Sequence, residues 1–93
     1  MSLDVIVLNP DDNVATAVRQ LESGEAISID GDTNITVFHP VPMGHKLALR
    51  DIPLGDKIIK YGEVVGRATA DIKPGEHVHV HNVEGLRGRG DKQ

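Results

Sequence analysis

Three histidines alternate with valines near one end of this 93-residue chain, in the run His77-Val78-His79-Val80-His81 that precedes Asn82. Imidazole nitrogens bind transition-metal ions and transfer protons near neutral pH. In a strand, residues two apart share a face at roughly 6.5–7 Å between Cα atoms, so neighbouring imidazoles can reach one metal ion or one substrate. His77, His79 and His81 are therefore candidate metal ligands, with Val78 and Val80 expected in the core. The alternative is a solvated polar face beside a buried valine face.

A second histidine follows a glycine loop, in the segment Pro42-Met43-Gly44-His45-Lys46. His45 is a candidate for proton transfer or metal binding, and Lys46 is a candidate for pairing with a carboxylate. The alternative is that both side chains are exposed on a solvated turn, which for Lys46 fits the sequence equally well. Several donors must converge on a bound anion, and one strand face supplies only one side of such a site. We therefore expect His45 to approach the face of His77, His79 and His81.

Two further cations accompany these motifs. Lys60 can neutralise an anion and Arg67 can bind a carboxylate in a bidentate manner, although a surface role for Arg67 is equally consistent with the sequence. Tyr61 is expected to pack, with its hydroxyl bonded to a partner. His39 lies between Phe38 and Pro40, and we expect it to be structural.

The elements that must position these residues are mostly short strands. Val14, Ala17, Val18 and Leu21 have the spacing of one helical face, which predicts a single short helix near residues 12–22. The rest of the chain is β-branched and punctuated by glycine and proline, which predicts strands. The predicted strands are Leu3 to Leu8, Ala26 to Ile29, Thr33 to Phe38, Lys46 to Leu49, Lys57 to Ile59, Val64 to Ala68 and His77 to Val83.

One turn pattern recurs along the chain. The segment from Asp51 to Ile58 matches the segment from Asp71 to Val78, and the segment from Gln20 to Ile27 is a weaker copy. Each copy has an apolar anchor, a tight turn, a glycine and then a strand. The repeat indicates a β fold and does not by itself indicate a function.

Composition limits the classes of function. The hydrophobic content of 39% is that of a globular protein, and the length suits one domain, predicted over residues 1–83 with a flexible tail over residues 84–93. The net charge of −4, with interspersed signs, argues against nucleic-acid and membrane partners. Without cysteine, the chain has no disulfide and no thiolate site. No signal peptide or membrane span is recognisable, so we expect a cytoplasmic protein. So small an aliphatic core is compatible with a partner subunit or a homo-oligomer.

Four motifs in order carry a family resemblance: Gly44-His45-Lys46, Lys60-Tyr61-Gly62, Gly66-Arg67-Ala68 and the run from Gly75 to Asn82. Together they resemble the N-terminal SAF domain of the altronate dehydratase and galactarate dehydratase family, over nearly the whole chain. The resemblance implies a β-clip fold. It also implies the small subunit of a sugar-acid dehydratase, a hydro-lyase acting on an aldonate or aldarate and inactive without a large catalytic subunit. The alternatives are the small subunit of sulfolactate sulfo-lyase, or a non-catalytic β-clip interaction module.

The implied chemistry is removal of the proton next to a carboxylate and expulsion of a β-hydroxyl, which needs a base, an acid and stabilisation of an enediolate. We assign catalytic roles to His45 and His79. The expected metal is a divalent ion such as Fe²⁺, held by His77, His79 and His81 and completed by the large subunit, with no organic cofactor. The residues expected to bind the anionic sugar acid are Lys46, Lys60, Arg67 and Asn82. The sequence leaves open which acid is the substrate and whether water or sulfite leaves.

Overall fold

The computed structural model describes residues 4–29 and 34–85, and every regular element within them is a strand, so the mostly-β prediction is confirmed. Within these ranges no helix is long and apolar enough to cross a membrane. The strands are β1 (Val5–Ile6), β2 (Val14–Ala17), β3 (Ala26–Ser28), β4 (Asn34–Thr36), β5 (Lys46–Ala48), β6 (Lys57–Lys60), β7 (Glu63–Ala68), β8 (His77–Val78) and β9 (Val83–Gly85).

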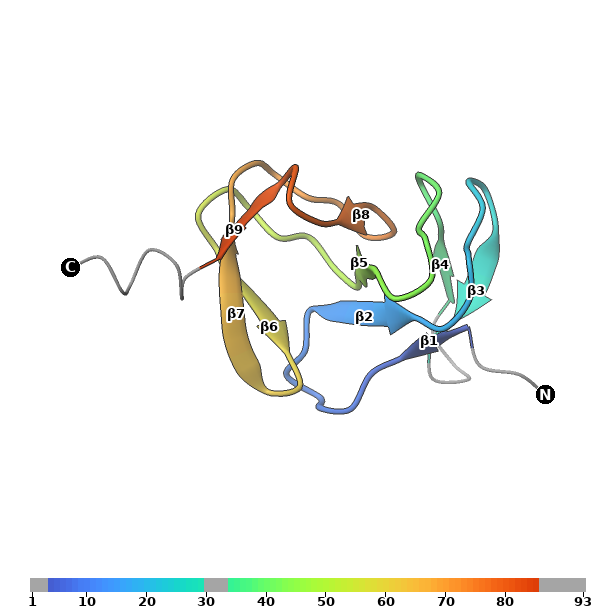
Figure 1. Ribbon diagram of the computed structural model, residues 1–93, viewed down its shortest axis with the longest axis horizontal. Helices are drawn as coiled ribbons and strands as arrows, with labels where there is room; N and C mark the ends of the chain where they lie inside the picture. Colours follow the sequence, from blue (N-terminus) through green and yellow to red (C-terminus); the bar gives the residue numbers. More distant parts are fainter. Residues whose placement is uncertain (1–3, 30–33, 86–93) are drawn as a thin grey trace.

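The described strands form three small antiparallel sheets (Figure 1). One sheet has the order β1-β2-β5-β8, the second is the β3-β4 hairpin, and the third has the order β6-β7-β9. Residues 84 and 85, predicted to belong to the tail, lie in β9. The rest of the predicted tail, residues 86–93, lies outside the described residues.

Four copies of one turn unit build most of this fold, over residues 20–27, 40–47, 51–58 and 71–78. The apolar anchors of the copies pair by isolated bridges, Leu21 with Val41 and Ile52 with Ile72. The turn glycine of every copy has a φ of 87–90°, a conformation that favours glycine. Three of these copies are recognisable as repeats in the sequence, whereas the copy over residues 40–47 was not predicted.

The predicted helix near residues 12–22 is wrong, because β2 occupies Val14–Ala17. This strand is hydrogen-bonded between two others, with Val5 opposite Ala17 and Ala15 opposite Leu47. Its two faces pack into two different cores: Val14 lies in one and Ala15 and Ala17 in the other. A helix would bury one face only, so tertiary packing overrides the helical spacing.

The two aliphatic cores lie on either side of β2. The core that contains Ala15 is built from Val5, Ala15, Ala17, Leu21, Ile27, Ile35, Val37, Val41 and Leu47. The core that contains Val14 is built from Val14, Ala48, Ile52, Ile58, Ala68, Ile72 and Val78. Strand β5 contributes Leu47 to the first core and Ala48 to the second, whereas β8 buries Val78 and leaves His77 half-buried.

Candidate functional site

Histidines from two distant segments meet beside β5 and β8. Nδ1 of His45 lies 2.8 Å from Nε2 of His77, across 32 residues of sequence. The ring of His79 stacks on that of His45, with 4.0 Å between centroids, and lies 5.5 Å from the ring of His77. The expected approach of His45 to the C-terminal histidines is confirmed. One nitrogen from each of the three rings lies within 4.8 Å of the others, and we call these residues the histidine cluster.

The histidines of the C-terminal run do not share one strand, as the alternation predicted. β8 ends at Val78, and a turn follows before β9 begins at Val83. Val78 is fully buried as expected, but Val80 is 80% exposed, so its predicted burial is wrong. His79 therefore reaches His45 from a turn and not by strand alternation. His81 is exposed on the same turn, with its ring centroid 5.2 Å from that of His77.

Asn82 holds this turn in place. Its side chain is buried, its Oδ1 accepts a hydrogen bond from the N–H of His79 at 3.0 Å, and its Nδ2 donates to the carbonyl of His77 at 2.9 Å. The N–H of Asn82 also donates to the carbonyl of His79. The amide predicted to bind substrate is thus used to fix the backbone of two cluster histidines.

The repeated turn distinguishes residue 45 from its counterparts in the other copies. The carboxylate of Glu76 accepts a hydrogen bond from the N–H of Lys73 in its own turn at 2.7 Å, and Glu25 caps its turn in the same way. In the copy over residues 40–47 the corresponding donor position is Pro42, which has no N–H. The copy over residues 51–58 also has a proline at this position, Pro53, and retains Asp56, so His45 is the departure that sets the copy over residues 40–47 apart. A histidine at a position that is acidic in the other three copies was the sequence signal for this residue.

The surroundings of His77 and His79 favour their neutral imidazoles. Burial, followed by the charges of the other four histidines, lowers the pKa of His77 to about 4. Burial also lowers the pKa of His79, with further contributions from His45 and Lys46. The charge of His39 is the smallest of the contributions at His77, and its ring packs against that of Phe38. Neutral imidazoles keep a lone pair for a metal ion or a proton at neutral pH.

Cationic side chains adjoin the cluster on one side. Lys46 and His79 line a cavity of about 210 Å³ together with Val80, Val83 and Gly85. Burial, followed by the charge of Lys60, lowers the pKa of Lys46. The ammonium of Lys60 also lies 4.9 Å from the ring centroid of Tyr61.

Arg67 is placed apart from this group. It lies on β7, opposite Lys57 on one neighbouring strand and Glu84 on the other. The histidine cluster is carried by β5, β8 and the turns beside them, in another sheet. Of the four residues predicted to bind substrate, Lys46 lies beside the cluster and Asn82 fixes the backbone of two of its histidines. Lys60 and Arg67 both lie on the sheet of β6, β7 and β9.

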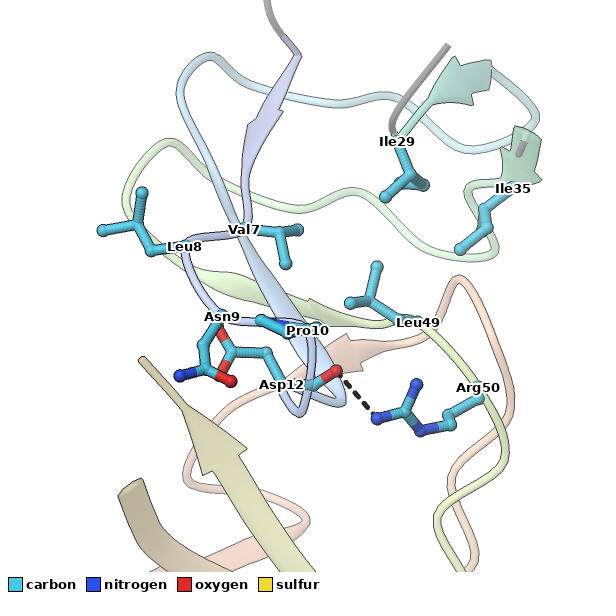
Figure 2. A pocket seen from close by; sticks show the side chains of 9 residues that line it. All are labelled: Val7, Leu8, Asn9, Pro10, Asp12, Ile29, Ile35, Leu49 and Arg50. Carbon is cyan, nitrogen blue, oxygen red and sulfur yellow. Dashed lines mark hydrogen bonds between the residues drawn. The ribbon is translucent and has the colours of Figure 1, made fainter. Parts of the chain in front are cut away.

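A larger cavity, about 460 Å³, lies elsewhere, between the β1–β2 connection, the β3-β4 hairpin and the end of β5 (Figure 2). Its wall is mostly aliphatic, and its one cation, Arg50, donates to the carbonyl of Asp12 at 2.9 Å. None of the histidines lines it. This cavity is larger than the one beside Lys46, but the histidines gather at the smaller one.

Comparisons with known proteins identify the family of this chain. The family described as the altronate/galactarate dehydratase SAF domain matches residues 3–86. The chain is 45% identical over 80 residues to altronate dehydratase of Escherichia coli, covering 86% of this chain and 16% of that protein. It is 40% identical over 93 residues to (2R)-sulfolactate sulfo-lyase subunit alpha of Chromohalobacter salexigens, covering 94% of this chain and 99% of that protein. The chain thus spans about one sixth of the altronate dehydratases that it matches.

Proposed function

Because this chain belongs to the altronate/galactarate dehydratase SAF-domain family, we propose that it supplies the histidine-bearing small part of a lyase that acts on an anionic hydroxy acid. The reaction is a dehydration of an aldonate or aldarate such as altronate or galactarate. The observation that carries the proposal is the meeting of His45, His77 and His79 from two segments of the chain. A fold that served only to present an interaction surface would not require this convergence.

The histidine cluster fits a divalent transition-metal ion. Two nitrogens on one ion, each about 2.0–2.1 Å from it, lie about 3 Å apart at neighbouring coordination positions. The 2.8 Å separation of His45 Nδ1 and His77 Nε2 is close to that value. Nitrogen donors suit Fe²⁺, Zn²⁺ or a similar ion, whereas Mg²⁺ and Ca²⁺ prefer oxygen. A bound ion would stabilise the negative charge that develops on the substrate carboxylate.

The remaining groups bind and orient the acid. Lys46, in the cavity beside His79, pairs with the substrate carboxylate, and Lys60 adds a second positive charge. Elimination breaks a C–H bond next to the carboxylate and the C–O bond of the β-hydroxyl, forms a C=C bond and releases water. With the cluster imidazoles committed as ligands, His81 is the histidine of the same turn left to move a proton.

The rest of the site comes from a large catalytic chain. The relatives named altronate dehydratase are about six times as long as the matched segment, so most of each relative lies outside it. The cavity of about 210 Å³ beside Lys46 is open, and elimination through an enediolate requires exclusion of water. We therefore assign the opposite wall, with the remaining ligands and acid–base groups, to the large chain.

A sulfo-lyase is the second candidate. The sulfolactate sulfo-lyase subunit alpha is matched over 99% of its length, so this chain is similar to a complete separate subunit. Sulfolactate is also an anionic hydroxy acid, and the same carboxylate-binding groups and cluster would serve elimination of sulfite instead of water.

The test is an assay of the chain together with the large chain of the same enzyme, on a panel of aldonates, aldarates and sulfolactate. We expect turnover of one class of acid by the pair and none by the isolated 93-residue chain. The acid that is turned over decides between dehydratase and sulfo-lyase. Turnover by the isolated chain, or by neither preparation, would contradict the proposal.

A further inference from the structure

Three exposed apolar side chains lie on segments that adjoin the histidine site along the chain or through a backbone hydrogen bond. Among the described residues, Phe38 is 58% exposed, Met43 is 69% exposed and Val80 is 80% exposed. They come from three separate segments: the end of the β3-β4 hairpin, the turn before β5 and the turn after β8. We call them the apolar rim. Large apolar residues at this exposure are ordinary when scattered, but they indicate a binding surface when they border a polar site.

Each residue of the apolar rim lies next to the site, either through a backbone hydrogen bond or through its position in the sequence. The N–H of Phe38 donates to the carbonyl of Gly75 at 2.9 Å, and Figure 1 shows the end of β4 beside the loop that leads into β8. The ring of Phe38 also meets that of His39 edge to face, with 4.5 Å between centroids. Met43 precedes the turn glycine before His45, and Val80 separates His79 from His81.

The turn that carries Val80 is already ordered. The N–H of His79 donates to the Asn82 side chain, the N–H of Asn82 donates to the carbonyl of His79, and the turn encloses Val80 between these bonds. A surface whose backbone is fixed before binding loses little conformational entropy when a partner covers it. An apolar side chain presented in this way has the properties of an anchor residue at the centre of an interface.

We propose that the apolar rim is the docking surface for the large catalytic chain, which would close over the histidine cluster. This inference rests on the proposed function, which requires a large catalytic chain. The chemistry of the site favours that chain as the occupant. The cluster and the adjoining lysine offer nitrogen donors and positive charge only. A partner that completes the site must therefore bring carboxylates to the centre and apolar pockets to the rim. A second copy of this chain would bring the same nitrogen donors and a second Lys46, whose charge repels that of the first.

The repeated turn provides a matched control. Met43 lies in the sequence Pro-Met-Gly, and Leu54 lies at the equivalent position of another copy, in Pro-Leu-Gly. Leu54 is 64% exposed, close to the value for Met43, but it belongs to the turn before β6. Met43→Ser and Leu54→Ser therefore remove similar apolar groups from similar turns, and only the first lies beside the histidine cluster.

The experiment measures the affinity of each variant for the purified large chain by isothermal titration calorimetry. We expect Met43→Ser and Val80→Ser each to weaken binding about tenfold, the double variant about a hundredfold, and Leu54→Ser less than twofold. Circular dichroism checks that each variant is folded. Equal weakening by Met43→Ser and Leu54→Ser, or no binding of the unchanged chain, would overturn the proposal.

Two further readouts separate this inference from the proposed function. Met43→Ser should bind Co²⁺, followed by its visible absorption, as tightly as the unchanged chain, because the rim residue supplies no ligand. If the unchanged pair is active and Met43→Ser binds the large chain normally, the docking surface is wrong and the proposed function stands. If sedimentation shows that the isolated chain is a dimer and Val80→Ser makes it monomeric, the rim joins two copies, and this proposal fails.

Discussion

Replacing Asn82 by alanine should lower both the stability of the domain and the metal affinity of the histidine cluster. The substitution removes the acceptor of the His79 N–H and the donor to the His77 carbonyl, both from a residue only 7% exposed. Leaving a buried backbone group without its partner costs about 1–3 kcal/mol, and water can reach part of this turn, so we expect a loss of about 2–3 kcal/mol in the free energy of unfolding. For a domain of this size that lowers Tm by about 10–20 °C.

The effect on metal binding follows from the same two hydrogen bonds. They fix the backbone of two of the three cluster histidines, and removing groups that orient metal ligands typically costs about 10–100-fold in affinity. We therefore expect Asn82→Ala to weaken Co²⁺ binding by about that factor, measured by titration at a temperature where the variant is folded.

Asn13 is a matched control for this prediction. It is 8% exposed, its Nδ2 donates to the carbonyl of Lys57 and its Oδ1 accepts from the N–H of Ile59, both at 2.8 Å. Lys57 and Ile59 have the same places in their copy of the repeated turn as the two histidines have in theirs. Asn13→Ala should lower Tm by a similar amount and leave Co²⁺ affinity unchanged. If both variants weaken Co²⁺ binding equally, or neither does, Asn82 does not position the cluster.

Three further predictions follow. Gly75→Ala should lower Tm much more than Gly55→Ala. Both glycines have φ near 90°, but a Cβ at Gly75 would clash with the Thr36 carbonyl oxygen, whereas one at Gly55 meets nothing within 4 Å. Thermal unfolding of the two variants measures the difference, and equal losses of Tm would refute the reasoning. Because the pKa of His77 is lowered to about 4 in the folded chain, the unfolded chain binds more protons between about pH 6.5 and pH 4, so stability should fall as the pH drops through that window. Urea unfolding across this range should show a smaller fall in His77→Gln, and an equal fall would refute this account of the pKa. Lys46→Met should raise the KM of the assembled enzyme for its acid with little change in Co²⁺ binding, and an unchanged KM would exclude pairing of Lys46 with the substrate carboxylate.

The mostly-β fold and the pairing of His45 with the C-terminal histidines could be predicted from sequence because both depend on residue types and on glycine positions. The helix near residues 12–22 could not be rejected, because β2 is a strand buried on both faces and its spacing happens to suit a helix as well. Only the neighbouring strands, far away in sequence, decide between the two structures.

The details of the site escaped prediction for a related reason. The alternation from His77 to His81 matches a strand, but Asn82 turns the chain back after Val78 through hydrogen bonds to the backbone. The fourth copy of the repeated turn was hidden because His45 replaces the acidic residue that follows the turn glycine in the other copies. The departures from the repeat are therefore where the candidate site is found.

The most direct test of the central claim is the turnover number of the enzyme assembled with His45→Ala. Position 45 has no capping role in its turn, so the variant should fold and associate with the large chain as the unchanged chain does. Its kcat on the acid that the unchanged pair consumes should fall by at least about a hundredfold, because the cluster loses one of three converging imidazoles. An assembled variant that turns over the acid at the unchanged rate would contradict the claim that these histidines form the functional site.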